Sequence, residues 1–405
     1  MLSGKTVLVG LSGGIACYKI AELVSLLKKQ HCNVHVIMTK NATEFISPLT
    51  FEALSGNRCI VDTFDRNYSY EIEHISLAKK ADLVIVAPAT ANIIAKLAHG
   101  IADDMLSTTI LACDCKKIIS PAMNTNMFEN VITQDNISLL RCYGFTVIDP
   151  DVGHLACGDT GAGKMPSPND LYDYIEKELY FNKDLQGKKV LVSAGATQES
   201  IDPVRYITNH SSGKMGFAMA KAAMLRGAEV TLITGKTTEN PPLKFVKTIE
   251  ITSAQDMFLN VTKVFKEQDI IIKAAAVADF TPENFSEEKI KKTDEKMTIS
   301  LNRTTDILKW LGEHRQDNQF LCGFSMETQN EIENSRKKLT KKNADMIVSN
   351  CLKKQGAGFQ SDTNILTIIT KDETVELPLL TKIEASHKVL DAIINEICKS
   401  QSTPD

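Results

Sequence analysis

The fold of the first half is decided by residues 1–40, which read MLSGKTVLVGLSGGIACYKIAELVSLLKKQHCNVHVIMTK. The β-branched run at 6–9 predicts a short strand, and the glycine-rich segment 10–14 predicts a tight turn. Apolar residues then recur at helical spacing over 16–29, and 34–38 predicts a second strand. Strand, helix and strand in this order are typical of a parallel βαβ unit.

The alternation of strands and helices continues along the chain and restarts once. Further strands are expected near 83–87, 117–120 and 145–148, and the polar segment 180–188 then precedes a new strand at 190–193. Later elements are expected as helices at 214–226, 254–267, 305–315 and 382–399, strands at 229–234, 245–251, 269–277, 320–324 and 346–349, and a hairpin over 364–379. The pattern therefore predicts an α/β fold with two doubly wound, mostly parallel sheets, one in 1–183 and one in 184–405.

Composition narrows the class of protein. A chain of 405 residues with 43% hydrophobic and 24% charged residues is typical of a globular protein with two or three domains. The net charge of −4 gives no basic field for nucleic acid. We see neither a signal peptide nor an apolar run long enough to span a membrane, so a cytoplasmic location is expected. The ten cysteines have neither disulfide nor zinc spacing.

The glycine-rich turn at 10–14 is a weak signal by itself. Small residues there let backbone N–H groups approach a phosphate at the start of the following helix. The spacing is not GxGxxG, and the next strand ends in Met38, Thr39 and Lys40 without the acid that binds a NAD ribose. A turn with no ligand is an equal alternative on this evidence. Polar loops after two later strands, at 88–92 and 121–127, favour a ligand, because ligands bind at the carboxyl ends of parallel strands.

Three motifs carry a resemblance to a known family. They are PATANxIAKxAxGxADD at 88–104, PAMNxxM at 121–127 and ACGDxGxGKM at 156–165. Together they resemble phosphopantothenoylcysteine decarboxylase, a flavin-containing cysteine decarboxylase with a flavodoxin-like fold. The resemblance implies a catalytic histidine at His74, a substrate-binding asparagine at Asn124 and a reductive-step cysteine at Cys157. It also implies FMN contacts from Ser12, Gly13, Gly14, Thr39, Ala89, Thr90 and Asn92.

The chemistry of this family explains the residue types. Direct loss of CO2 from a cysteine carboxylate would leave an unstabilised carbanion, whereas prior oxidation of the thiol to a thioaldehyde provides an electron sink, with FMN as hydride acceptor. His74 suits a base or electrostatic guide, Asn124 can bind the carboxylate, and Cys157 can supply a proton. Taken singly, the three read as an ordinary surface residue, a turn residue and a buried thiol. Two positions depart from the family pattern, Phe128 in place of Trp and Lys164 in place of Arg.

The second half contains its own glycine-rich helix start. Ser211, Ser212, Gly213 and Lys214 form an anion cradle before the expected helix, although a Walker loop is absent because Met215 follows the lysine. A capped helix start without a ligand is an equal alternative for these residues alone.

Four further motifs resemble phosphopantothenate–cysteine ligase, whose nucleotide domain is Rossmann-like. They are GATxExID at 195–202, TNxSSGKMG at 208–216, AAAVADF at 274–280 and EKIKK at 288–292. The resemblance implies that CTP, with Mg2+, activates the carboxylate of 4'-phosphopantothenate, and that cysteine then attacks the acyl cytidylate. It implies Asn209 as the residue that stabilises this intermediate. It also implies nucleotide contacts from Asp279, Lys289, Phe324, Lys338 and Lys342. The segment 304–306 departs from the family's Asn-Pro-Asp, so it is left outside the predicted site, and no metal ligand is predicted.

The two resemblances together predict a bifunctional enzyme of coenzyme A synthesis, with small-molecule substrates and neither nucleic-acid nor membrane partners. They imply a homo-oligomer built from trimeric flavin domains and dimeric ligase domains. Two alternatives remain, a flavin-dependent peptidyl-cysteine decarboxylase and a non-catalytic regulatory flavoprotein. The ligase half argues against the first, and the joint presence of His74, Asn124 and Cys157 argues against the second. The choice between CTP and ATP stays open.

Overall fold

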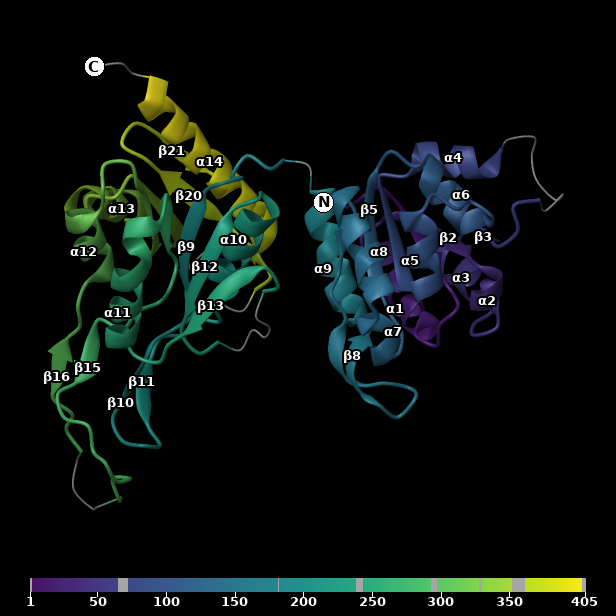
Figure 1. Cartoon of the computed structure of the whole chain (residues 1–405). Coiled ribbons are helices and arrows are strands. Elements are labelled where there is room, and N and C mark those ends of the chain that lie inside the picture. The colour runs from purple at the N-terminus through teal and green to yellow at the C-terminus, as the bar shows by residue number, and fades with distance from the viewer. Residues whose placement is uncertain are drawn as a thin grey trace. The chain divides into compact units, whose positions relative to one another are not determined.

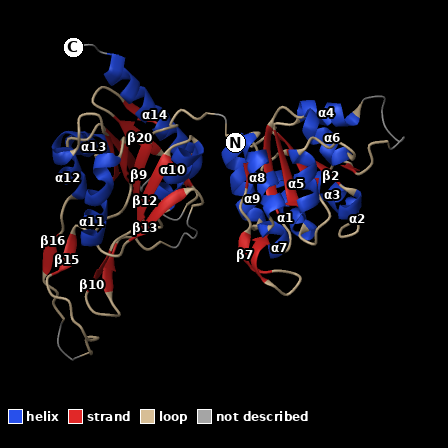
Figure 2. Cartoon of the chain, viewed as in Figure 1, coloured by secondary structure: helices blue, strands red, loops and turns tan. Residues whose placement is uncertain are grey.

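The computed structural model describes residues 2–64, 72–180, 182–237, 243–292, 297–327, 330–351 and 361–402. The chain divides into two compact units, Met1–Phe181 and Asn182–Asp405 (Figure 1). Figure 2 shows helices on both sides of the strands in each unit. The predicted α/β class with doubly wound, mostly parallel sheets is confirmed.

The first unit is built on a fully parallel sheet with strand order β3-β2-β1-β4-β5-β6. This is the doubly wound order with its switch point between β1 and β4, rather than the 2-1-3-4-5 order of flavodoxin itself. An antiparallel hairpin, β7–β8, follows the sheet. The strands are β1 (Thr6–Leu11), β2 (Asn33–Met38), β3 (Cys59–Ile60), β4 (Leu83–Ala89), β5 (Lys116–Pro121), β6 (Thr146–Val147), β7 (Asp151–His154) and β8 (Thr160–Lys164). The helices are α1 (Cys17–Lys29), α2 (Lys40–Thr43), α3 (Pro48–Ser55), α4 (Glu73–Lys80), α5 (Ala91–Ala98), α6 (Met105–Ala112), α7 (Thr125–Glu129), α8 (Val131–Cys142) and α9 (Pro168–Leu179).

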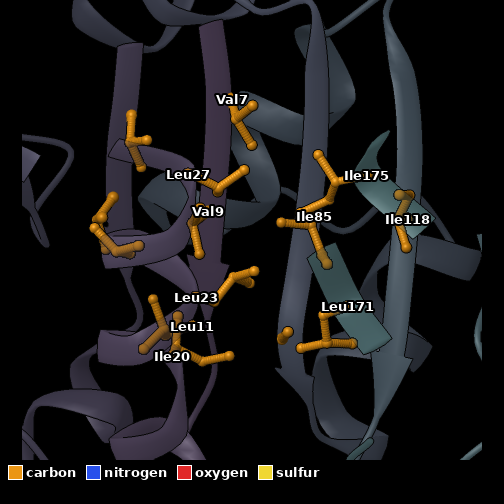
Figure 3. Packing of buried hydrophobic residues seen from close by; sticks show 14 of the residues in the cluster. Val7, Val9, Leu11, Ile20, Leu23, Leu27, Ile85, Ile118, Leu171 and Ile175 are labelled. Atoms are coloured by element: carbon orange, nitrogen blue, oxygen red, sulfur yellow. The ribbon is translucent and has the colours of Figure 1, made fainter. Parts of the chain in front are cut away.

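Both faces of this sheet are buried, which explains why its strands read as continuous apolar runs. On β1, Val7 and Val9 face one core cluster while Leu8 faces the other, as the two-residue period of a strand requires. Figure 3 shows side chains from α1 and α9 gathered over β1, β4 and β5 in the first cluster. The opposite cluster receives side chains from α4, α5, α6 and α8. The polar loops follow the strands at their carboxyl ends.

The second unit contains a mixed sheet with the order β13-β12-β9-β14-β17-β18-β20-β21. In this sheet β20 pairs antiparallel with β18, and β21 pairs antiparallel with β20. The strands are β9 (Lys189–Ala194), β12 (Glu229–Thr234), β13 (Val246–Glu250), β14 (Ile270–Lys273), β17 (Phe320–Glu327), β18 (Met346–Cys351), β20 (Leu366–Ile369) and β21 (Thr374–Glu376). The helices are α10 (Lys214–Leu225), α11 (Ala254–Val264), η1 (Phe265–Glu267), α12 (Ile307–His314), α13 (Glu331–Lys341) and α14 (Lys382–Ser402). Short antiparallel pairs are β10 (Gln198–Ser200) with β11 (Tyr206–Thr208), β15 (Phe280–Pro282) with β16 (Leu301–Arg303), and β19 (Thr363–Asn364) with β22 (Leu380–Thr381).

The strand expected over 269–277 ends earlier, at Lys273. The backbone of the alanines after it continues beside the end of β9 and the loop that follows β9, but forms only an isolated bridge there, between Ala276 and Ala196. Ala274 N donates to Ser193 O at 3.1 Å, and Ala276 N donates to Gly195 O at 2.8 Å. This turn opens a polar-lined space at the carboxyl end of the sheet. Among the described residues, no helix is long and apolar enough to cross a membrane.

A buried lysine makes the stability of the second unit depend on pH. Burial lowers the pKa of Lys273 to about 7, against an opposing effect of the Asp306 charge. Its Nζ lies 3.6 Å from the sulfur of Met257. At and below pH 7 the fold therefore bears the cost of a buried charge. Between pH 7 and the ordinary lysine value of 10.5 the unfolded chain holds more protons, so stability rises with pH.

We expect Lys273→Met to stabilise the second unit by roughly 3 kcal/mol at pH 7, because it removes this cost. The gain should shrink as the pH approaches 10.5. Guanidinium unfolding followed by fluorescence measures it, because the single tryptophan, Trp310, packs on Phe265 in this unit. Lys309→Met, at an exposed lysine of α12, is the control and should change little. A gain that is absent at pH 7, or equally large at pH 10, would contradict this assignment.

Candidate active sites

A cavity of about 650 Å³ lies at the carboxyl ends of β1, β4 and β5 in the first unit. It brings together residues from the glycine turn, the loop after β4, the loop after β5 and the β7–β8 hairpin. Of the residues predicted from the sequence, it is lined by Gly13, Gly14, Thr90, Asn124 and Cys157. Tyr18, Met127, His154 and Lys164 line it as well. The loops that the sequence predicts after different strands thus lie together at one edge of the sheet.

The glycine turn is fastened to the loop after β4 by Ser12. Its hydroxyl donates to Pro88 O at 2.8 Å and accepts from Thr90 N at 2.9 Å. Thr90 in turn caps α5 by accepting from Ile93 N. Gly13 is required sterically, since a Cβ there would lie 2.5 Å from the Cβ of Asn41. Ser12 therefore holds the turn in place, and the two glycines leave backbone accessible at the cavity.

Three other predicted FMN residues lie at the same edge but are not among the residues that line the cavity. Thr39 follows β2, and its backbone N donates to Leu11 O at 2.9 Å. Its hydroxyl oxygen is buried and has no hydrogen-bond partner within the described residues. Ala89 is buried at the end of β4, and Asn92 is exposed on the first turn of α5. A buried hydroxyl without a partner beside a glycine turn fits a ligand that carries oxygen acceptors, as FMN does.

Asn124 and Cys157 come together across the cavity. Asn124 Nδ2 lies 3.3 Å from Cys157 Sγ and donates to Asp159 Oδ2 at 2.8 Å. Asn124 Oδ1 accepts from Asn126 N at 2.9 Å and so caps α7. Because the oxygen is used by the cap, the NH2 group faces the hairpin. The amide is thus free of the cap on its NH2 side, where it contacts Cys157 and Asp159.

Two glycines let the β7–β8 hairpin approach the loop that carries Asn124. Met123 N donates to Gly163 O at 3.1 Å. A Cβ on Gly163 would lie 2.2 Å from Met123 O, and one on Gly161 would lie 2.5 Å from Thr125 Oγ1. Two of the three glycines of the ACGDxGxGKM motif, Gly161 and Gly163, are therefore explained by close packing against the PAMNxxM loop.

The described lining of this cavity does not include His74. That residue lies on the first turn of α4, and α4 packs on the sheet face that also carries α5, α6 and α8. Lys164, where Arg was expected, does line the cavity, so its charge is retained there. Phe128, where Trp was expected, packs against the core of that same face.

A second cavity, of about 550 Å³, lies in the second unit between the start of α10 and the ends of β14, β17 and β18. It brings together Asn209, Asp279, Phe324 and Lys338 of the predicted residues. Asn209 Nδ2 donates to Ala276 O at 3.2 Å, and Lys338 Nζ donates to Ser325 Oγ at 3.2 Å. The backbone around residues 211–216, predicted as an anion cradle, lines the cavity too.

Close packing shapes the cradle at the start of α10. Gly213 has φ +82°, a left-handed conformation that favours glycine. A Cβ on Gly216 would lie 2.5 Å from the Cβ of Ala194 at the end of β9. The helix start is thus pressed against the end of the central strand and lies at the cavity edge, where the helix dipole favours an anion.

Two predicted nucleotide residues, Lys289 and Lys342, are not among the described residues that line this cavity. Lys342 pairs with Asp306 at the start of α12. Burial raises the pKa of Asp306, but the hydrogen bonds from Lys342 and from Lys309 N, together with the charges of Lys342 and Lys338, outweigh burial and hold the pKa below its usual value. Lys289 is exposed in the segment between β15 and β16, which extend from one end of the unit together with β10 and β11 (Figure 1).

The structure adds lining residues that the sequence did not single out. Asn350 is the penultimate residue of β18, is 8% exposed and has an Oδ1 with no partner among the described residues. Asn364 and Lys382 line the cavity from segments far along the chain. The position of Asn350 near the end of a parallel strand is the sequence signal that could have identified it as a site residue. No local sequence pattern marks Asn364 or Lys382. No group of three or more His, Cys, Asp or Glu suited to a metal ion occurs among the described residues.

Comparison with known proteins gives the same division of the chain. Residues 1–180 match the family model described as Flavoprotein, and residues 185–397 match that of the DNA/pantothenate metabolism flavoprotein C-terminal domain. The chain is 48% identical over 396 residues to the Coenzyme A biosynthesis bifunctional protein CoaBC of Bacillus subtilis, covering 97% of each chain. It is 41% identical over 399 residues to the protein of that name in Haemophilus influenzae, covering 98% of this chain and 99% of the relative.

Among solved structures, the chain is similar to the C-terminal domain of a Coenzyme A biosynthesis bifunctional protein CoaBC. The match has 45% identity and a TM-score of 0.46, and covers 55% of this chain and 100% of that one. The two family models and the full-length similarity to the bacterial relatives settle the family. The chain belongs to the family of bifunctional coenzyme A biosynthesis proteins.

Proposed function

We propose that this chain converts 4'-phosphopantothenate and cysteine to 4'-phosphopantetheine in two steps. The second unit, assigned to 184–405, ligates cysteine to the acid with CTP, and the first unit, assigned to 1–183, decarboxylates the product with FMN. The observation that carries the proposal is that each unit has a cavity lined by several of the residues predicted for its chemistry. Asn124 meets Cys157 in one, and Asn209 meets Asp279 and Lys338 in the other. A regulatory flavoprotein would need neither set.

In the first unit, the backbone of Gly13 and Gly14 with the hydroxyl of Thr39 would hold FMN, which supplies hydride acceptance and return when bound. The Asn124 amide binds the substrate carboxylate, and the Cys157 thiol beside it donates a proton in the reductive step. His74 lies outside this lining, which supports a site completed by another copy of the chain. We therefore propose a homo-oligomer in which flavin units form trimers and ligase units form dimers.

In the second unit, Asp279, Phe324 and Lys338 would hold the nucleotide, and Asn209 would donate to the oxygen that becomes charged as the acyl cytidylate forms and reacts. Activation is needed because a free carboxylate has a poor leaving group. Mg2+ would bind mainly through the phosphates of CTP, as is common for this ion. Lys289 and Lys342 would join the site only after their segments move. A cytoplasmic location fits these small-molecule substrates.

Thr39→Val tests the flavin site without disturbing the fold. The substitution removes a buried hydroxyl that has no partner in the described part of the chain, so the flavin-free protein should be as stable as the wild type or slightly more stable. If the hydroxyl binds FMN, affinity should fall about tenfold. Quenching of FMN fluorescence measures the affinity, and thermal melting of the flavin-free chain measures the stability.

Thr43→Val is the matched control, because the Thr43 hydroxyl already donates to Lys40 O at 2.7 Å. It should leave FMN affinity within twofold of wild type. Unchanged FMN affinity in Thr39→Val would remove Thr39 from the site, and failure of the wild type to bind FMN would refute the proposed decarboxylase.

A further inference from the structure

Asp159 joins Asn124 and Cys157 in a closed set of contacts. Its Oδ2 accepts from Asn124 Nδ2 at 2.8 Å and from Cys157 Sγ at 3.3 Å. The same Nδ2 lies 3.3 Å from Cys157 Sγ. Asp159 belongs to the ACGDxGxGKM motif, yet it has no assigned role in the proposed decarboxylation. One carboxylate oxygen thus engages both groups on which the decarboxylase depends.

Both ends of this contact are held by the local backbone. Asn124 presents its NH2 group to the hairpin because its oxygen caps α7. Asp159 is held in a tight turn at the hairpin tip, where Leu155 N donates to Asp159 O at 2.9 Å and Gly158 has φ +92°. The backbone on both sides of the contact is therefore held in place, and the carboxylate meets the amide from a tight turn.

We propose that the Asp159 carboxylate occupies the place on Asn124 that the substrate carboxylate takes, and that the substrate displaces it. The inference rests on the proposed decarboxylase activity. Both groups are carboxylates, and an amide NH2 is a donor for either. Two carboxylates at one donor repel each other, so only one is accommodated at a time. Asp159 is thus a positioning residue that acts through Asn124 and Cys157.

Because the substrate carboxylate displaces Asp159 from Asn124, the hairpin distinguishes the substrate from the product, which has no carboxylate. A ligand that carries the carboxylate competes with Asp159 for Asn124 and frees the Cys157 thiol from its acceptor. Once CO2 has left, the product offers no carboxylate to the amide, and Asp159 can return to it. The contact therefore weakens the binding of carboxylated ligands selectively, and has no such effect on ligands that lack the carboxylate.

Asp159→Asn tests this in the FMN-loaded full chain. The probes are phosphopantothenoylserine, which keeps the carboxylate but has a hydroxyl in place of the thiol, and phosphopantetheine, which lacks the carboxylate. Titrations are followed by the change in the flavin absorbance spectrum, which reports the first unit alone. We expect the variant to bind phosphopantothenoylserine about tenfold more tightly, because a neutral amide is the weaker competitor for Asn124. Its affinity for phosphopantetheine should stay within twofold of wild type.

Asp151→Asn is the matched control, an exposed aspartate at the other end of the same hairpin. It should leave both affinities within twofold. Equal changes for the two probes in Asp159→Asn, no change for either, or weaker binding of phosphopantothenoylserine would overturn the displacement. A wild-type protein that binds neither probe would refute the decarboxylase itself, and the displacement with it.

Discussion

Replacing Cys157 with serine is expected to separate CO2 release from formation of phosphopantetheine. The thiol lies beside the Asn124 amide on an exposed hairpin, so serine preserves the size of the side chain and the fold of the tip. Carboxylate binding and decarboxylation should therefore persist. A serine hydroxyl is a much weaker acid than a thiol, so proton donation in the reductive step should fail.

The expected yield of phosphopantetheine falls by about 100-fold or more, the range associated with loss of a general acid. A product two hydrogens lighter, the enethiol, should accumulate together with CO2, and mass spectrometry distinguishes the two products. Cys142→Ser is the control, because Cys142 is an exposed thiol at the end of α8. Normal phosphopantetheine yields from Cys157→Ser would show that another group donates the proton.

Asn209→Asp should abolish most of the ligation. The Asn209 amide donates to Ala276 O at 3.2 Å at the wall of the second cavity, where the anion cradle and Lys338 also lie. Aspartate removes the donor and places a negative charge beside a carbonyl oxygen and the phosphates of the nucleotide. The rate of ligation should fall by about 100- to 1,000-fold, as when an oxyanion donor is lost.

The two-unit organisation supplies an internal control for this variant. Decarboxylation of added phosphopantothenoylcysteine should be unchanged, because the first cavity lies in the other compact unit. Asn260→Asp provides a second control, since Asn260 lies on α11 and donates to Asp256 O within that helix. A ligation rate within twofold of wild type in Asn209→Asp would remove Asn209 from the mechanism.

The fold could be predicted because its signals are local. The strands buried on both faces read as apolar runs, and the helices show their period over enough residues to be recognised. The early end of β14 could not be read from the alanines that follow it. Their apolar character resembles a strand, and Ala274 N still donates to Ser193 O in β9, but Ala276 N donates to Gly195 O in the loop after β9. Tertiary hydrogen bonding decided that boundary.

The sites could be predicted only where a motif and its geometry coincide. Asn124 and Cys157 lie in different motifs that fold against each other, so the structure brings them together. A motif alone does not specify which cavity its side chains reach, and His74, Lys289 and Lys342 lie outside the two described linings. Asn364 and Lys382 reach the second cavity from segments far along the chain, and no local pattern marks them.

The most direct test of the central claim is the product mixture of the purified full chain supplied with FMN, Mg2+, 4'-phosphopantothenate, cysteine and CTP. Mass spectrometry should find phosphopantetheine and CMP in equal amounts, with phosphopantothenoylcysteine appearing first and then declining. A parallel reaction with ATP shows which nucleotide the ligase unit uses. Absence of phosphopantetheine with both nucleotides, or its formation without any nucleotide, would contradict the account.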